Sequence, residues 1–255
     1  MFSTKDSRAK LDRARIHLSE MYSGFHGFLD GSSLNIPLYL YCDVENSQIV
    51  AAVREMPIMP NNFGILIGDA IHNYRSSLDY LWWQIAVKNI GRSPTKQEES
   101  SIQFPIFSDA ANWGRHRYFN HVPAAGLDFI KDIQPFNFDN DEKSYSPLLV
   151  LNELSNRDKH RALVPVLVLA KQAGYVNFTD RNVRLADCEL PAVINVGAEI
   201  ARFTLDLEGI EAEKAIQASF SSYISIHNNI NVFDALEAID ELCDTVLEIA
   251  ERRFG

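Results

Sequence analysis

The sequence Gly68-Asp-Ala-Ile-His-Asn-Tyr-Arg-Ser-Ser-Leu-Asp-Tyr-Leu-Trp-Trp83 decides how the rest of this 255-residue chain is interpreted. On a helix with about 100° per residue, one side of this region collects apolar residues: Leu66, Ile67, Ala70, Tyr74, Leu78, Leu81 and Ile85. The opposite side is polar: Asp69, His72, Asn73, Arg75, Ser76 and Asp79. Exposed helix faces usually carry Lys and Glu, yet neither occurs from Gly64 to Val87. The pattern predicts a helix over residues 62–90 whose polar side is also covered.

A second segment, Asn152-Glu-Leu-Ser-Asn-Arg-Asp-Lys-His-Arg161, places similar residue types on another predicted helix. Ser146 followed by Pro147 is typical of a helix start, and we expect this helix to run to about residue 161. Two such helices packed together would enclose a titratable cluster between their polar faces. Such a cluster is costly unless every group is satisfied, and it is often functional.

Residue spacing selects the candidate site within these two helices. His72 and Asp79 are seven residues apart, which places them two turns apart on one face. Glu153 and His160 have the same spacing. We predict a shared, water-poor recess with four catalytic candidates: His72, Arg75, Asp79 and His160. The ligand-binding candidates are Asn73, Glu153, Asn156, Asp158, Lys159 and Arg161.

The rest of the chain predicts an α+β fold, a mainly α-helical bundle with an attached antiparallel β subdomain. Periodicity predicts helices at residues 8–30, Asp109–Phe119, Ala124–Ile133 and 232–252. Alternation predicts strands at Ile36–Val44 and Gln48–Arg54, joined as a hairpin, and at Val164–Leu169, Tyr175–Thr179, Arg202–Leu207 and Gln217–Ile226. We expect a single domain, 1–255, with the bundle at 8–31, 62–161 and 232–252 and the β elements at 36–54 and 163–226.

Composition indicates a cytoplasmic globular protein. The chain is 46% hydrophobic and 23% charged, its N-terminus is polar, and we expect no secretory signal. The longest apolar run, Leu163–Ala170, is too short to span a bilayer, and no membrane association is expected. Cys42, Cys188 and Cys243 lack metal-ligand spacing, which favours reduced thiols.

The net charge of −10 disfavours a role in gripping long nucleic acids, which usually requires a basic face. Any such role therefore depends on a local basic site. One candidate is Arg157, Lys159 and Arg161; the other consists of Lys5, Arg8, Lys10, Arg13 and Arg15. We interpret the second group as a solvated helix face.

Several of these segments together resemble a group of uncharacterised bacterial proteins. In that group a GD-x-x-HN-x-RS-x-LD-x-L helix is followed at a distance by DKHR, as at Gly68–Leu81 and Asp158–Arg161 here. Phe104-Pro-Ile-Phe107 and Gln134-Pro135 belong to the same resemblance, which covers roughly residues 60–165. It implies no particular activity.

A more distant resemblance is to HEPN domains, helical bundles that often dimerise and many of which cleave RNA in toxin and phage-defence systems. Their signature is an Arg with a polar neighbour, followed by His after four to six residues. Arg75-Ser76 fits, but position 80 is Tyr. The resemblance implies RNA or nucleotide binding and a homodimer, whereas Tyr80 departs from the usual metal-independent cleavage site.

Three functions follow as alternatives. In HEPN-like RNA binding or cleavage, His72 or His160 would act as base and acid, and Arg75 and Arg161 would contact the phosphate. In a helical-bundle metal protein, the ligands would be His72, Asp79, Glu153 and His160. In a non-enzymatic interaction or defence accessory protein, the polar groups would only hold helices together. The residues favour the first alternative, and they imply no particular cofactor.

Overall fold

The computed structural model divides the chain into two compact units. The first unit contains Met1–Tyr22, Asn61–Val164 and Phe233–Gly255, and the second contains Ser23–Pro60 and Pro165–Val232. The structure describes residues 2–32, 38–46, 48–55, 58–113, 119–123, 127–139, 143, 146–161, 163, 165–169, 175–178, 183–186, 196–205, 216–219, 222–226 and 230–255. The first unit gathers most of the helical segments and the second gathers the strands. The description as a single domain stays a prediction.

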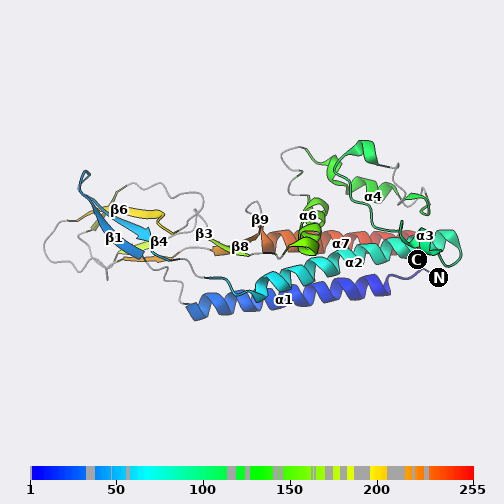
Figure 1. Ribbon diagram of the computed structural model, residues 1–255, viewed down its shortest axis with the longest axis horizontal. Helices are drawn as coiled ribbons and strands as arrows, with labels where there is room; N and C mark the ends of the chain where they lie inside the picture. Colours follow the sequence, from blue (N-terminus) through cyan, green and yellow to red (C-terminus); the bar gives the residue numbers. More distant parts are fainter. Residues whose placement is uncertain are drawn as a thin grey trace. The chain divides into compact units, whose positions relative to one another are not determined.

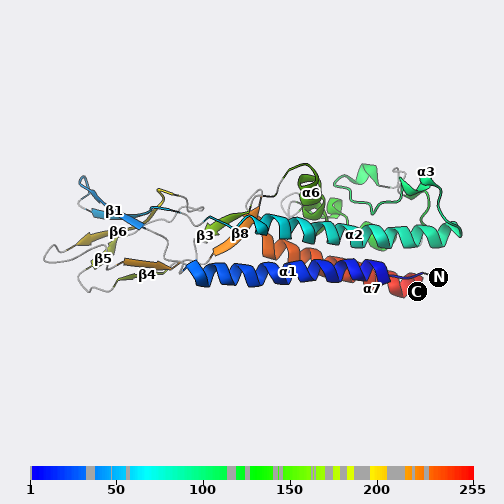
Figure 2. The same cartoon turned by 60° about the horizontal axis from the view of Figure 1, so that its bottom comes forward.

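Three long helices run side by side in the first unit (Figures 1 and 2). They are α1 (Lys5–Ser32, of which residues 5–22 belong to this unit), α2 (Asn62–Ile90) and α7 (Val232–Phe254). A fourth helix, α6 (Pro147–His160), packs across α2. Short helices complete the unit: α3 (Lys96–Glu99), η1 (Ala110–Asn112), α4 (Asp128–Asp132) and η4 (Pro135–Asn137).

The core of the first unit comes from the apolar faces that helical periodicity predicts. On α2 the buried side chains include Ile67, Ala70, Tyr74, Leu78, Leu81 and Ile85. The facing core residues of α1 and α7 include Leu11, Ala14, Met21, Leu236, Ile239, Cys243, Val246 and Ala250. Trp82 on α2 is also fully buried. Burying each large apolar side chain contributes about 1.5–3 kcal/mol, so these residues are a major source of the stability of the bundle.

Helix α2 ends where a glycine permits the chain to turn. Gly91 has a φ of 72°, in the left-handed region, and its N–H donates to the Val87 carbonyl. This αL cap satisfies one of the last free carbonyls of the helix.

The second unit is built from antiparallel strands. A four-stranded sheet has the order β1 (Leu38–Asp43), β2 (Gln48–Val53), β6 (Glu199–Leu205) and β5 (Val183–Ala186). A three-stranded sheet has the order β3 (Val166–Leu169), β8 (Ser222–Ile226) and β9 (Ile230–Asn231). The remaining pair is β4 (Tyr175–Phe178) with β7 (Ile216–Ser219). Arg202 on β6 forms an ion pair with Asp43 on β1, which links two strands of the four-stranded sheet, and a second ion pair with Glu199 on its own strand.

The prediction of an α+β fold, mainly helical, is confirmed. The hairpin is present as β1 and β2, paired antiparallel with Leu38 opposite Val53. The single strand predicted at Gln217–Ile226 is wrong, because this segment supplies β7 and β8, which belong to different sheets. Strand β5 was not predicted, because its four residues, Val-Arg-Leu-Ala, are too few to show a clear alternation of apolar and polar side chains.

Among the shorter elements, the helix predicted at Asp109–Phe119 is reduced to η1 in the part that is described, and residues 114–118 lie outside the described residues. Cys188 also lies outside them. Within the residues that the structure describes, no helix combines the length and the apolar character needed to cross a membrane.

Candidate functional site

The two motif helices meet where a glycine of α2 lies against an aspartate of α6. A Cβ added to Gly68 would lie 2.7 Å from Asp158 Oδ1, closer than such atoms approach in real structures. Glycine therefore permits the Asp158 carboxylate to rest on the α2 backbone. The expectation that α2 and α6 are neighbours is correct, and this contact gives Gly68 and Asp158 a packing role in this chain.

Arg75 and Asp79, two of the four catalytic candidates, bind each other and then the loop after α3. Arg75 Nε donates to Asp79 Oδ2 at 3.2 Å, and Nη2 lies 3.1 Å from Oδ1. Nη2 also donates to the Phe104 carbonyl at 2.9 Å, and Asp79 Oδ1 accepts the Phe104 N–H at 2.9 Å. The pair thus replaces the hydrogen bonds that a neighbouring strand would supply to Phe104. We call this arrangement the Phe104 clamp.

Gln134 holds the other end of the same loop. Its side chain is fully buried, its Oε1 accepts the Phe107 N–H at 2.8 Å, and its Nε2 donates to the carbonyls of Pro105 and Ile130, each at 3.1 Å. Trp82 of α2 packs edge-on against Phe104, with ring centroids 5.8 Å apart. The motif residues from Arg75 to Gln134 therefore form a continuous structural assembly.

The remaining candidates do not share a buried recess. On α2, His72 is exposed and Asn73 is buried, with its amide donating to the Asp69 carbonyl at 2.7 Å. On α6 the candidates are all exposed: Glu153, Asn156, Asp158, Lys159, His160 and Arg161. The expected water-poor recess is therefore wrong. Only part of the polar side of α2 is covered, because the loop at Phe104 lies over Arg75 and Asp79 but leaves His72 in solvent.

The metal alternative requires His72, Asp79, Glu153 and His160 to gather around one ion. Across the described parts of the chain, no three or more His, Cys, Asp or Glu side chains form a group that could hold a metal ion. Asp79 also accepts hydrogen bonds from Arg75 and from the Phe104 N–H. These four side chains do not make a metal centre.

A surface pocket that the sequence did not predict lies beside the clamp in the first unit. Its volume is about 570 Å³, and its lining residues are Asp6, Asp79, Tyr80, Trp83, Gln84, Glu99 and Ile102. Tyr80 and Trp83 lie three residues apart on α2, so they share one helix face. That spacing was the one signal in the sequence that could have indicated the pocket. The lining residues Asp6 of α1 and Glu99 of α3 are distant in sequence, so no local pattern links them to Tyr80 and Trp83.

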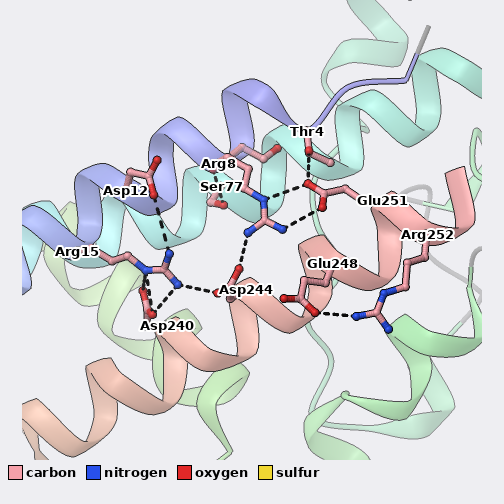
Figure 3. A network of polar contacts seen from close by, with 11 residues as sticks. Thr4, Arg8, Asp12, Arg15, Ser77, Asp240, Asp244, Glu248, Glu251 and Arg252 are labelled. Carbon is pink, nitrogen blue, oxygen red and sulfur yellow. Dashed lines mark hydrogen bonds and ion pairs between the residues drawn. The ribbon is translucent and has the colours of Figure 1, made fainter. Parts of the chain in front are cut away.

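Two of the five basic residues of the α1 group, Arg8 and Arg15, form ion pairs with α7 (Figure 3). Arg15 donates to Asp240 at 2.9 Å and to Asp244 at 2.9 Å, both on α7. Arg8 donates to Glu251 at 3.0 Å and also pairs with Asp244. The Arg8 and Arg15 side chains are 31% and 39% exposed, so they lie on a partly solvated face and at the same time link α1 to α7.

The ion pairs between α1 and α7 lower the pKa values of the carboxylates that take part in them. The Arg15 hydrogen bond holds the pKa of Asp244 below its usual value, and the Arg8 hydrogen bond does the same for the pKa of Glu251. Burial raises the pKa of Tyr22 to about 12, with a further contribution from the hydrogen bond to Glu237. Charged carboxylates and neutral tyrosine are thus the stable forms at neutral pH.

Comparison with family models, with curated proteins and with solved structures finds no match to this chain. The resemblance to the GD-x-x-HN family and to HEPN domains stays a prediction.

Proposed function

We propose that this protein acts by binding, as a non-enzymatic interaction protein, and not by catalysis. The observation that carries the proposal is the Phe104 clamp. Arg75 uses Nε and Nη2 on Asp79 and on the Phe104 carbonyl, and Asp79 uses both oxygens on Arg75 and the Phe104 N–H. An arginine held in this way is poorly placed to contact a phosphate, and a carboxylate held in this way is poorly placed to orient an imidazole.

The exposure of both candidate histidines adds to this argument. General acid–base catalysis depends on positioned groups, usually in a site that excludes water. His72 and His160 are exposed on the surface. Surface imidazoles suit recognition of a partner better than proton transfer in a closed site.

RNA or nucleotide binding at the end of α6 is a second candidate, favoured by one observation. The last turn of this helix carries Arg157, Lys159 and His160, and Arg161 follows as its C-cap. Lys159, His160 and Arg161 are exposed, so their charges are accessible to a phosphate backbone. Cations near a helix C-terminus also interact favourably with the helix dipole and stabilise the helix, which gives these residues a structural role as well.

One RNA experiment tests both candidates. Fluorescently labelled single-stranded and hairpin RNAs are incubated with the protein, and cleavage is followed on gels while anisotropy reports binding. We expect intact RNA with the wild-type protein. If the protein also binds RNA, the double variant Lys159→Ala/Arg161→Ala weakens binding about tenfold, because it removes two cations that could contact phosphates. The loss of affinity should be similar for all RNA sequences, since phosphate contacts do not read the bases. The control Lys96→Ala/Lys131→Ala removes two exposed cations elsewhere and leaves binding unchanged.

The proposal of a non-enzymatic protein fails if RNA is cleaved and the cleavage disappears in His72→Ala or His160→Ala while the thermal midpoint stays the same. The RNA-binding candidate fails if the control variant weakens binding as much as Lys159→Ala/Arg161→Ala. It also fails if the wild-type protein leaves the RNA anisotropy unchanged at about 0.05 M salt, a low concentration at which phosphate contacts are strong.

A further inference from the structure

The pocket beside the Phe104 clamp has the size and composition of a ligand site. Its volume of about 570 Å³ falls in the range of small-molecule pockets. Four of its lining residues come from α2, and the others come from α1, α3 and the chain just after α3. Asp79 contributes to both the clamp and the pocket wall, so the clamp fixes one wall of the pocket in place.

The charge of the pocket is negative. Its lining residues include three carboxylates, Asp6, Asp79 and Glu99, and no cation is among the seven described residues that line it. Asp79 is neutralised by Arg75 at 3.1 Å. The charges that remain for a ligand are those of Asp6 and Glu99, which are both exposed and come from different helices.

The rings of the pocket favour a cation with an apolar stem. Tyr80 is 44% exposed and Trp83 is half-buried, so both rings offer surface to a ligand. Lys10 Nζ lies 5.8 Å from the centroid of the Tyr80 ring, so a ligand ammonium at this ring would share it with Lys10 or displace Lys10. Ile102 is buried, with 7% of its surface exposed, and adds a small aliphatic contact, while the Gln84 amide adds a hydrogen-bonding group.

We propose that this pocket binds a linear aliphatic polyamine. Its ammonium groups pair with Asp6 and Glu99, and its methylene segments pack on Trp83, Tyr80 and Ile102. Two exposed carboxylates alone would accept any cation, but the two rings and Ile102 select one that carries hydrocarbon between its charges. This inference rests on the proposed binding function, since it names a ligand that the protein holds without chemical change.

The test uses the full chain, with spermidine as the probe, and measures binding by isothermal titration calorimetry in 0.15 M salt. We expect one site per chain. The double variant Asp6→Asn/Glu99→Gln weakens binding about tenfold, because it removes two exposed ion pairs that each contribute modestly to affinity. Trp83→Leu weakens binding about fivefold through the lost cation–π contact. The control Asp12→Asn/Glu20→Gln removes the same charge from α1 outside the pocket and binds like the wild type.

Thermal unfolding of each variant checks that the fold persists. The inference is overturned if spermidine does not bind, if the control loses as much affinity as Asp6→Asn/Glu99→Gln, or if Mg²⁺ at equal charge displaces spermidine completely, since that would leave only charge screening. These outcomes are independent of the RNA experiment. RNA cleavage would refute the non-enzymatic function without affecting spermidine binding, and absent spermidine binding would leave the non-enzymatic function standing.

Discussion

At the scale of single residues, Asp79 and His72 lie on the same side of α2 in a helical projection of the sequence but differ in their surroundings. Asp79 is bound by Arg75 and by the Phe104 N–H, whereas His72 is exposed. The two residues thus differ in energetic weight, although both were predicted as catalytic. A partly buried, charge-assisted hydrogen-bond network contributes much more to stability than an exposed imidazole.

Arg75→Met should lower the free energy of unfolding by about 2 kcal/mol, because it removes charge-assisted bonds to Asp79 and to the Phe104 carbonyl while keeping the aliphatic stem. His72→Ala is the matched control on the same helix and should change stability by less than about 0.5 kcal/mol. Urea denaturation followed by tryptophan fluorescence measures both. An equal cost for His72→Ala would mean that the imidazole is enclosed in solution.

At the scale of elements, the packing of α2 against α6 depends on a close approach. The Asp158 carboxylate occupies the space that a Cβ at position 68 would need. A side chain there must displace the carboxylate, which is the mobile end of an exposed residue. The loss of stability on replacing Gly68 therefore depends on how easily the Asp158 side chain can move, and not on the helix backbone.

A double-mutant cycle of Gly68→Ala and Asp158→Ala measures this contact. Alanine in a helix interior is favoured over glycine by about 1 kcal/mol. We expect that gain to be offset in the Gly68→Ala single variant, and to appear in the Asp158→Ala background. A coupling energy of about 1 kcal/mol from chemical denaturation is the expected result. Additive effects would show that the two residues do not touch.

At the scale of the whole molecule, hydrogen bonds from arginine and asparagine side chains favour the charged form of carboxylates in both units. The pKa of Asp244 is lowered by Arg15 and that of Glu251 by Arg8 in the first unit. In the second unit, the hydrogen bond from Asn46, followed by the one from Arg202, lowers the pKa of Asp43. Each such carboxylate binds fewer protons in the folded chain than in the unfolded chain.

Stability should therefore fall in acid. A carboxylate with a lowered folded pKa contributes fully above its unfolded pKa, near 4, and the contribution is lost as pH falls through the folded pKa. We expect the free energy of unfolding to decline from about pH 5 downward. Arg8→Met/Arg15→Met should flatten this decline, as urea titrations between about pH 5 and 3 would show. An unchanged slope would mean that these ion pairs contribute nothing measurable.

Much of the fold follows from local sequence pattern. Steps of three and four residues predict α1, α2, α6 and α7 close to their observed bounds, and alternation predicts the β1–β2 hairpin. The pattern also identifies Arg75 and Asp79 as unusual residues for a helix face. It misjudges Gln217–Ile226, because alternation does not reveal where a chain passes from one sheet to another.

The sequence by itself determined which residues share a helix face, since that depends only on the helical repeat. Only the tertiary structure decided what covers each face. Asp79 meets Phe104, which is 25 residues away, and Arg15 meets Asp240, which is 225 residues away. Such partners are chosen by how the elements pack, and no local period encodes them. For the same reason the carboxylates and rings of the pocket, drawn from α1, α2 and α3, became a candidate site only in three dimensions.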